Sequence, residues 1–122
     1  MAWKLNSDRP IYAQIIEELQ FRIVSGEYQA GQRMPSVREL AAQAEVNPNT
    51  MQKALAEMEQ KGLLHSQRTS GRFVTEDENM IEQIKQNLAK EQIITFVENM
   101  RQLGFDNDGI LAQVQNIVKE DE

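Results

Sequence analysis

A mainly α-helical fold with one small β-hairpin is predicted for this chain by three observations. Apolar residues recur at helical spacing over residues 10–60, with two clear interruptions. Two short β-prone runs flank a basic, glycine-containing tip at residues 63–75. From residue 76 onward helical spacing resumes in a much more acidic stretch. We therefore expect one compact domain at residues 1–75 and a two-helix tail at residues 76–122.

The first helix is expected over residues 10–25. Pro10 suits its first turn, because the N–H that proline lacks would have no partner there. Gly26 is expected to end it. Trp3 and Leu5 precede the helix and are expected to pack an N-terminal strand onto the body. The apolar positions of the helix are Tyr12, Ile15, Ile16, Leu19 and Ile23.

Residues 36–55, SVRELAAQAEVNPNTMQKAL, predict two short helices joined by a tight turn. Ser36 is followed three positions later by Glu39, which is the signature of a capping box. Asn47 and Pro48 are typical of the N-cap and first position of the next helix. The second helix of this pair, which is the third of the chain, opens with small polar side chains and is therefore suited to present its start to the edges of DNA bases. Its buried stripe is expected to consist of Met51, Ala54, Leu55 and Met58.

The segment LLHSQRTSGRFVT at residues 63–75 predicts a hairpin next to this helix pair. A basic tip is suited to a narrow minor groove, where the negative potential is enhanced and attracts arginine. The helix pair and the hairpin are each weak signals alone. In this order and at this spacing they indicate a winged helix-turn-helix domain that binds double-stranded DNA.

The net charge of −6 is unevenly distributed along the chain. Residues 1–75 contain nine Lys/Arg and eight Asp/Glu, a net charge of +1. Residues 76–122 contain four Lys/Arg and eleven Asp/Glu, a net charge of −7. Phosphate binding depends on where the basic groups lie and not on their sum over the chain. The acidic balance therefore does not exclude a DNA-binding protein.

The candidate DNA contacts come from both helices of the pair and from the hairpin tip. Amides and hydroxyls at the start of the third helix can donate and accept at base edges, and Lys53 can reach a phosphate or a guanine. Arg38 is placed to contact the DNA backbone, with a surface ion pair to a nearby glutamate as the alternative. Helix capping is the alternative role of Ser36 and Asn47. The full set is Ser36, Arg38, Asn47, Asn49, Thr50, Gln52, Lys53, Arg68, Thr69, Ser70, Gly71 and Arg72.

The sequence lacks the residues that other classes of function require. The chain has no cysteine and one histidine, His65, with no evident carboxylate partners for a metal, so we expect a strand residue. Residues 106–109 resemble the start of a calcium loop, but Leu111 and Ile117 stand where that loop needs Gly and Glu. We expect a helix cap there instead. No nucleophile–base arrangement, P-loop or dinucleotide motif is present, so neither an enzyme nor a cofactor is expected. No signal-peptide core or membrane span is evident, which predicts a cytoplasmic protein.

The tail carries apolar stripes on either side of a break at residues 104–108. Two helices of this size cannot bury such stripes against each other alone. We therefore expect a homodimer through the C-terminal helices. Two alternatives remain: a winged-helix module that docks another protein through its acidic tail, and a regulator with a pocket for an unknown small effector. The stripes comprise Ile81, Ile84, Leu88, Ile93, Val97, Met100 and Leu103, then Ile110, Leu111, Val114, Ile117 and Val118.

The stretch from Pro10 to Val74 resembles the DNA-binding domain of the GntR family of bacterial transcription regulators. The matching segments are PIYAQI, GQRMPSVRELAAQAEVNPNTMQKALAEMEQKGLL and RTSGRFV. The short tail and the NPNT helix start are similar to the YtrA subfamily, whose two-helix tail serves dimerisation. Its members often repress operons that include transporter genes. The resemblance thus implies a homodimeric repressor that binds an inverted-repeat operator.

The same resemblance implies that Arg38, residues 47–52 and Gly71 contact operator DNA. Two positions differ from many relatives. Thr69 stands where they have glycine, and Gln52 stands where they have a basic residue. The amide at Gln52 suggests a changed base preference, for adenine more than for guanine.

Overall fold

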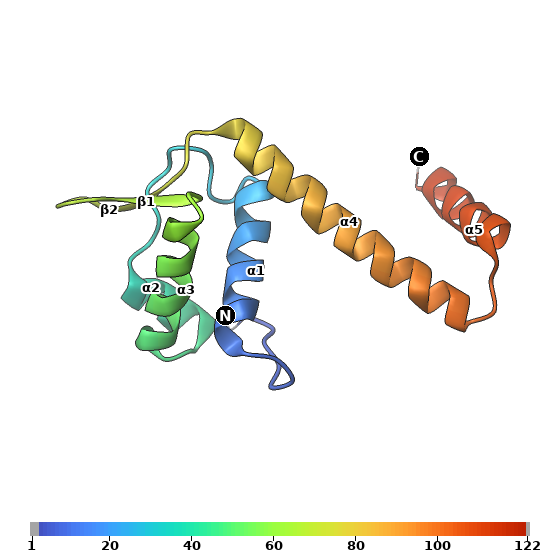
Figure 1. Cartoon of the computed structure of the whole chain (residues 1–122), viewed down its shortest axis with the longest axis horizontal. Helices are drawn as coiled ribbons and strands as arrows, with labels where there is room; N and C mark the ends of the chain where they lie inside the picture. Colours follow the sequence, from blue (N-terminus) through green and yellow to red (C-terminus); the bar gives the residue numbers. More distant parts are fainter. Residues whose placement is uncertain (1–2, 122) are drawn as a thin grey trace. The chain divides into compact units, whose positions relative to one another are not determined.

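The computed structural model describes residues 3–121, which form five helices and one antiparallel hairpin (Figure 1). The predicted mainly α fold with a small hairpin is confirmed. The chain divides into two compact units, one ending at Lys85 and the other beginning at Gln86. Within residues 3–121, no helix combines the length and apolar composition that a membrane crossing requires. In chain order the elements are α1 (Ile11–Val24), α2 (Val37–Ala44), α3 (Pro48–Gln60), β1 (Leu64–Gln67), β2 (Gly71–Val74), α4 (Glu78–Gln102) and α5 (Asn107–Glu120).

The starts of α2 and α3 are fixed by the predicted caps. The Ser36 hydroxyl accepts from the Glu39 N–H at 3.1 Å, and the Glu39 carboxylate accepts from the Ser36 N–H at 3.2 Å. The Asn47 side-chain oxygen accepts from the Asn49 N–H at 2.7 Å, and Pro48 occupies the first helical position. These bonds satisfy N–H groups that have no partner inside the helix. The short turn between α2 and α3 is therefore specified locally.

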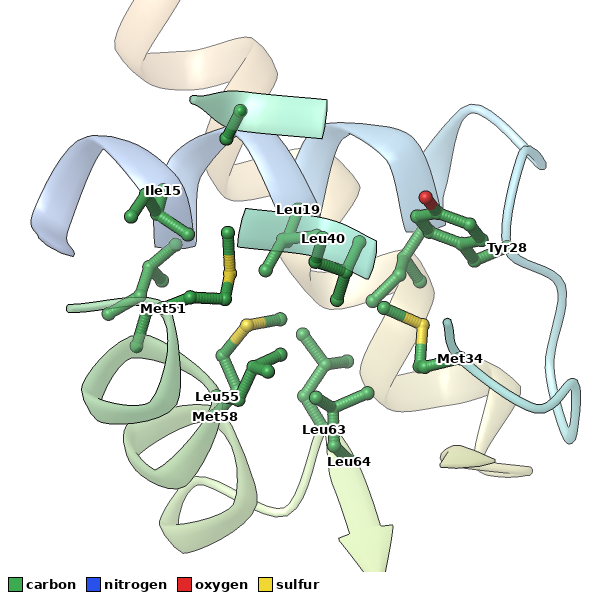
Figure 2. Close-up of a cluster of buried hydrophobic side chains, with 14 of the residues drawn as sticks. Ile15, Leu19, Tyr28, Met34, Leu40, Met51, Leu55, Met58, Leu63 and Leu64 are labelled. Atoms are coloured by element: carbon green, nitrogen blue, oxygen red, sulfur yellow. The ribbon is translucent and has the colours of Figure 1, made fainter. Parts of the chain in front are cut away.

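The core of the first unit lies between α1, α2 and α3 (Figure 2). The predicted α3 stripe is confirmed, since all four of its residues are at most 1% exposed. Methionines supply much of the packing, and their flexible thioethers suit the irregular spaces between three short helices. Figure 2 shows these side chains directed toward one another from the helices and from the segment before α2. The labelled core residues are Ile15, Leu19, Tyr28, Met34, Leu40, Met51, Leu55, Met58, Leu63 and Leu64.

The N-terminal segment packs as predicted but forms no strand. Trp3 is buried and Leu5 is half-buried against the core, whereas the described residues before α1 have no strand pairing. The backbone of Asn6 is instead bound by the buried side chain of Gln14, which donates at 2.7 Å and accepts at 2.9 Å. A glutamine side chain thus satisfies the groups that a neighbouring strand would have satisfied.

The hairpin is attached to the start of α2 by a third backbone segment. β1 and β2 pair antiparallel, and an isolated bridge adds Arg33 opposite Phe73. The Met34 N–H donates to the Arg72 carbonyl at 2.8 Å. His65 lies on β1 as predicted, with its ring stacked on Phe73 at 5.9 Å between centroids. The hairpin is therefore held at the same end of the unit as the α2 cap.

The first two turns of α4 belong to the first unit. Met80, Ile81 and Ile84 are half-buried and pack against the core cluster of that unit. Asp77 begins the helix, since its carboxylate accepts the Met80 N–H at 3.2 Å. The packing boundary at Lys85 therefore falls later than the change of composition after residue 75.

The second unit consists of the remainder of α4 followed by α5. The predicted break is present, with Gly104 at φ +101° and the Asp106 carboxylate accepting the Gly109 N–H at 2.8 Å. That bond confirms a helix cap at residues 106–109. Of the described residues of this unit, only Ile110 is buried. The large apolar side chains left exposed are Ile93, Ile94, Phe96, Leu103, Phe105, Leu111, Val114, Ile117 and Val118.

Candidate nucleic-acid interface

The N-terminal half of α3 presents its predicted polar side chains to solvent. Asn49 and Gln52 are exposed and Thr50 is half-buried, while buried Met51 fixes the helix to the core. Asn47 is also exposed, but its side-chain oxygen is used in the cap. The N–H groups of this first turn and the positive end of the helix dipole favour an anion. The start of α3 is thus available to contact both bases and phosphates.

Lys53 extends from the same part of α3 toward α1. Its ammonium nitrogen lies 4.0 Å from the centroid of the Tyr12 ring, in cation–π geometry. The lysine is nonetheless exposed. Its charge is therefore accessible while its position is restricted.

Arg38 lies in the first turn of α2 and is exposed. The alternative of a surface ion pair is not realised, because neither Glu39 nor Glu45 pairs with it among residues 3–121. Glu39 is instead committed to the capping box, where hydrogen bonds from Ser36 hold the pKa of its carboxyl below the ordinary value. Arg38 is left as an unneutralised cation next to the α2 N-terminus.

The hairpin tip carries the remaining predicted contacts. Arg68, Thr69 and Ser70 are all exposed, and the Ser70 N–H closes the turn on the Gln67 carbonyl at 3.1 Å. Gly71 begins the return strand at φ +96°, a conformation that other residues rarely adopt. The requirement for glycine at this position is thus conformational.

Arg72 is turned inward, unlike the tip residues. Its Nε is hydrogen-bonded to the Glu59 carboxylate, and its Nη1 donates to the Gln52 side-chain oxygen at 3.3 Å. The Ser66 hydroxyl also donates to Glu59, at 2.8 Å. Burial opposes ionisation of Glu59, but the bonds from Arg72 and Ser66 outweigh it and hold the pKa of this carboxyl below its ordinary value. The structure therefore brings Arg72 to Gln52, and not to the exposed tip.

A groove of about 410 Å³ lies between the start of α2 and the hairpin. It contains Arg33, a cation outside the set of DNA contacts predicted from the sequence. A side-chain Cβ built on Gly71 would lie 3.4 Å from Arg33 Nε, so the guanidinium of Arg33 lies next to Gly71. Arg33 is brought to the hairpin because its segment pairs with β2. A single sequence does not reveal that pairing. Charged and polar residues lining the groove are Arg33, Ser36, Ser66, Gln67, Arg68 and Arg72.

These features define a class of protein. A helix pair joined by a short turn, a second helix with an exposed polar start and a basic hairpin beside it form a winged helix-turn-helix. In agreement, residues 11–74 match the model of the bacterial regulatory proteins of the gntR family. The chain belongs to the GntR family and is a DNA-binding transcriptional regulator.

Individual relatives support the assignment over nearly the whole chain. The uncharacterized HTH-type transcriptional regulator YhcF of Bacillus subtilis is 34% identical over 116 residues, covering 95% of this chain and 96% of that protein. The HTH-type transcriptional repressor YtrA of the same organism is 30% identical over 112 residues, covering 91% and 86%.

Solved structures show the same fold. A GntR family transcriptional regulator from Listeria monocytogenes superimposes with a TM-score of 0.82 at 39% identity, covering 92% of this chain and 98% of that one. The DNA-binding domain of AraR in complex with operator ORX1 superimposes with a TM-score of 0.53 at 33% identity, covering 62% of this chain and 92% of that one. The first match includes the tail, and the second is limited to about the length of the first unit.

Proposed function

We propose that the protein is a homodimeric transcriptional repressor that binds an inverted-repeat operator. The observation that carries this proposal is the exposed start of α3 flanked by unpaired cations, Arg38 on α2 and Arg68 on the hairpin. The repressor role is supported by the similarity to YtrA, which is named as a repressor. Because such a regulator must meet the chromosome of a bacterium, we place it in the cytoplasm.

In the proposed complex, α3 of each protomer enters the major groove. Asn49, Thr50 and Gln52 contact base edges, where amide and hydroxyl groups can distinguish base pairs. Arg38 and Lys53 contact phosphates, which supply affinity but little sequence information. Ser36 and Asn47 cap α2 and α3 and lie at helix N-termini, where the N–H groups and the helix dipole favour a DNA phosphate.

The hairpin is proposed to reach the neighbouring minor groove. Arg68 is its leading cation, with Thr69 and Ser70 alongside and Gly71 permitting the turn. We add Arg33 to the predicted set, because its guanidinium borders the same groove of the protein as Arg68. The AraR DNA-binding domain, which has a related fold, is solved in complex with an operator, and this supports operator binding by the first unit.

Dimerisation is proposed to occur through the second unit. Its apolar side chains are left uncovered in one copy of the chain, and a second copy provides a matching surface. A dimer that separates its two α3 helices by about 34 Å would engage one face of the duplex, which explains an inverted repeat.

The experiment that tests this function is selection of bound sequences from a random double-stranded DNA pool by the full chain. An enriched inverted repeat is expected, with saturable binding in a gel shift that weakens steeply with salt. Arg38→Ala should reduce the affinity, whereas Lys90→Ala, which removes the same charge from an exposed tail position, should change it little. If no sequence is enriched, the alternative of a protein-docking module gains support. An unchanged affinity in a folded Arg38→Ala protein would contradict the interface.

A further inference from the structure

The side-chain amide of Gln52 has a defined orientation. Arg72 Nη1 lies 3.3 Å from Gln52 Oε1, which joins α3 to the hairpin across twenty positions of sequence. A guanidinium has only N–H donors and no acceptor. The amide oxygen, and not the amide nitrogen, must therefore face Arg72. This orientation follows from the chemistry of the pair.

Arg72 is in turn held by α3 itself. Its Nε is bound to Glu59 Oε1, and that oxygen also accepts the Ser66 hydroxyl at 2.8 Å. The Arg72 and Glu59 side chains are only 17% and 28% exposed. A charge-assisted bond in such partial burial restricts the guanidinium more than a solvated pair would. The four residues form one chain of hydrogen bonds from the hairpin to the base-reading position.

This arrangement changes what Gln52 offers to DNA. A free glutamine reads adenine with two bonds, accepting from N6 at its oxygen and donating to N7 from its nitrogen. With one lone pair of its oxygen bound to a cation, Gln52 presents the two hydrogens of Nε2 and one remaining lone pair that lies beside the guanidinium. An approaching adenine amino group would meet the guanidinium, which is also a donor. Guanine presents two acceptors, N7 and O6, and complements a surface of donors.

We propose that Arg72 is a positioning residue that makes Gln52 a donor and thereby makes α3 select guanine over adenine at the base pair Gln52 faces. This inference rests on the proposed function, in which Gln52 contacts a base edge. It is the opposite of the adenine preference that the sequence alone favours for an isolated amide. Arg72 need not contact DNA to have this effect.

The test compares the base preferences of four proteins in selection from a random double-stranded DNA pool. The wild type should enrich guanine at one position of each half-site, and Gln52→Ala should lose the preference at that position only. Arg72→Met keeps a similar apolar stem but removes the donors, so the preference should change to adenine by roughly tenfold. Arg72→Lys retains a donor for the amide oxygen and should keep guanine.

A second measurement uses the wild-type chain and needs no folded variant. An operator with 7-deazaguanine at the selected position lacks the N7 acceptor. An operator with adenine there has an amino donor in place of the O6 acceptor. Each should weaken binding on the order of tenfold, while the same changes at a position not contacted should have no effect.

The outcomes separate this inference from the proposed function. A loss of affinity in Arg72→Met with guanine still enriched, in a protein whose circular dichroism and melting temperature match the wild type, would overturn the inference alone. Equal binding of the guanine and 7-deazaguanine operators by the wild type would also overturn it. Absence of any enriched sequence with the wild-type chain would instead refute the proposed function.

Discussion

The ammonium nitrogen of Lys53 lies 4.0 Å from the centroid of the Tyr12 ring, which connects the exposed face of α3 to α1. A cation–π contact at an exposed site is worth about 0.5–1 kcal/mol. A contact of this strength orients the lysine but does not prevent it from leaving the ring. Lys53 can therefore exchange Tyr12 for a DNA phosphate at a small cost in free energy.

Lys53→Met should remove one phosphate contact per protomer. The slope of log affinity against log salt should become shallower by about 0.9 for each half-site, because one fewer counterion is released. Fluorescence anisotropy with a labelled operator at several salt concentrations measures that slope. Tyr12→Leu is the matched control, since it removes the ring and keeps the charge, and its slope should equal that of the wild type. An unchanged slope for Lys53→Met would show that the lysine does not contact phosphate.

Gly71→Ala should destabilise the hairpin and weaken DNA binding. Its φ of +96° strains any side chain, and the added Cβ would lie 3.4 Å from Arg33 Nε. We expect a loss of about 1 kcal/mol or more in the free energy of unfolding, measured by thermal denaturation. The operator affinity should fall as well, because backbone strain at Gly71 disturbs the adjoining hairpin tip.

Gly26→Ala provides the control for backbone strain. Gly26 has a similar φ of +92°, but an added Cβ would meet nothing within 4 Å. This variant should lose comparable stability and keep its operator affinity. If both variants bind the operator like the wild type, the hairpin tip has no part in recognition.

The helix pair could be predicted from sequence because its signals are local. The capping box of Ser36 and Glu39 and the N-cap at Asn47 each depend on residues at most three positions apart. The expected N-terminal strand was wrong for the opposite reason. A strand needs a partner, and the side chain of Gln14, eight positions from Asn6, satisfies that backbone instead.

The orientation of Arg72 was likewise beyond the reach of sequence patterns. It depends on how β2 is placed against α3, which brings Glu59 and Gln52 to the guanidinium from thirteen and twenty positions away. Composition marks Arg72 as a basic hairpin residue suited to DNA. Only the tertiary arrangement shows that its charge is already paired.

Glu59→Gln should make the stability of the protein less dependent on pH. Because the folded-state pKa of Glu59 lies below its ordinary value of 4.5, ionised Glu59 stabilises the native state at neutral pH. This stabilisation should be fully present above that ordinary value and be lost as the pH falls through the lower folded-state pKa. At neutral pH we expect the variant to be less stable by about 1 kcal/mol, given the partial exposure of the pair.

Thermal unfolding of both proteins from about pH 3 to about pH 7 checks this prediction. The difference in melting temperature should be largest near neutrality and shrink in acid. Glu57→Gln is the control on the same helix, since its ion pair with Lys61 is longer, at 3.5 Å, and more exposed. A difference between wild type and Glu59→Gln that does not vary with pH would contradict the role of the ionised carboxylate.

The apolar face of α5 gives the sharpest test of dimerisation. Leu111 and Val118 are 61% and 56% exposed, and their spacing of seven positions places them on one face of the helix. Their exposure in a single copy is the reason to expect a partner there. Replacement of both by aspartate would put two charges per protomer into the proposed interface, where burial of unpaired charge is costly.

Leu111→Asp/Val118→Asp should therefore convert the protein to a monomer in sedimentation equilibrium. Affinity for a complete inverted repeat should fall by tenfold or more, because the second half-site is no longer bound by a linked copy, whereas affinity for an isolated half-site should not change. Asn116→Asp, on the face of α5 away from these apolar side chains, introduces the same residue type at an exposed position and should leave the dimer intact. A dimer that persists in the double variant would mean that the second unit does not hold the copies together, and the inverted-repeat geometry would then need another interface.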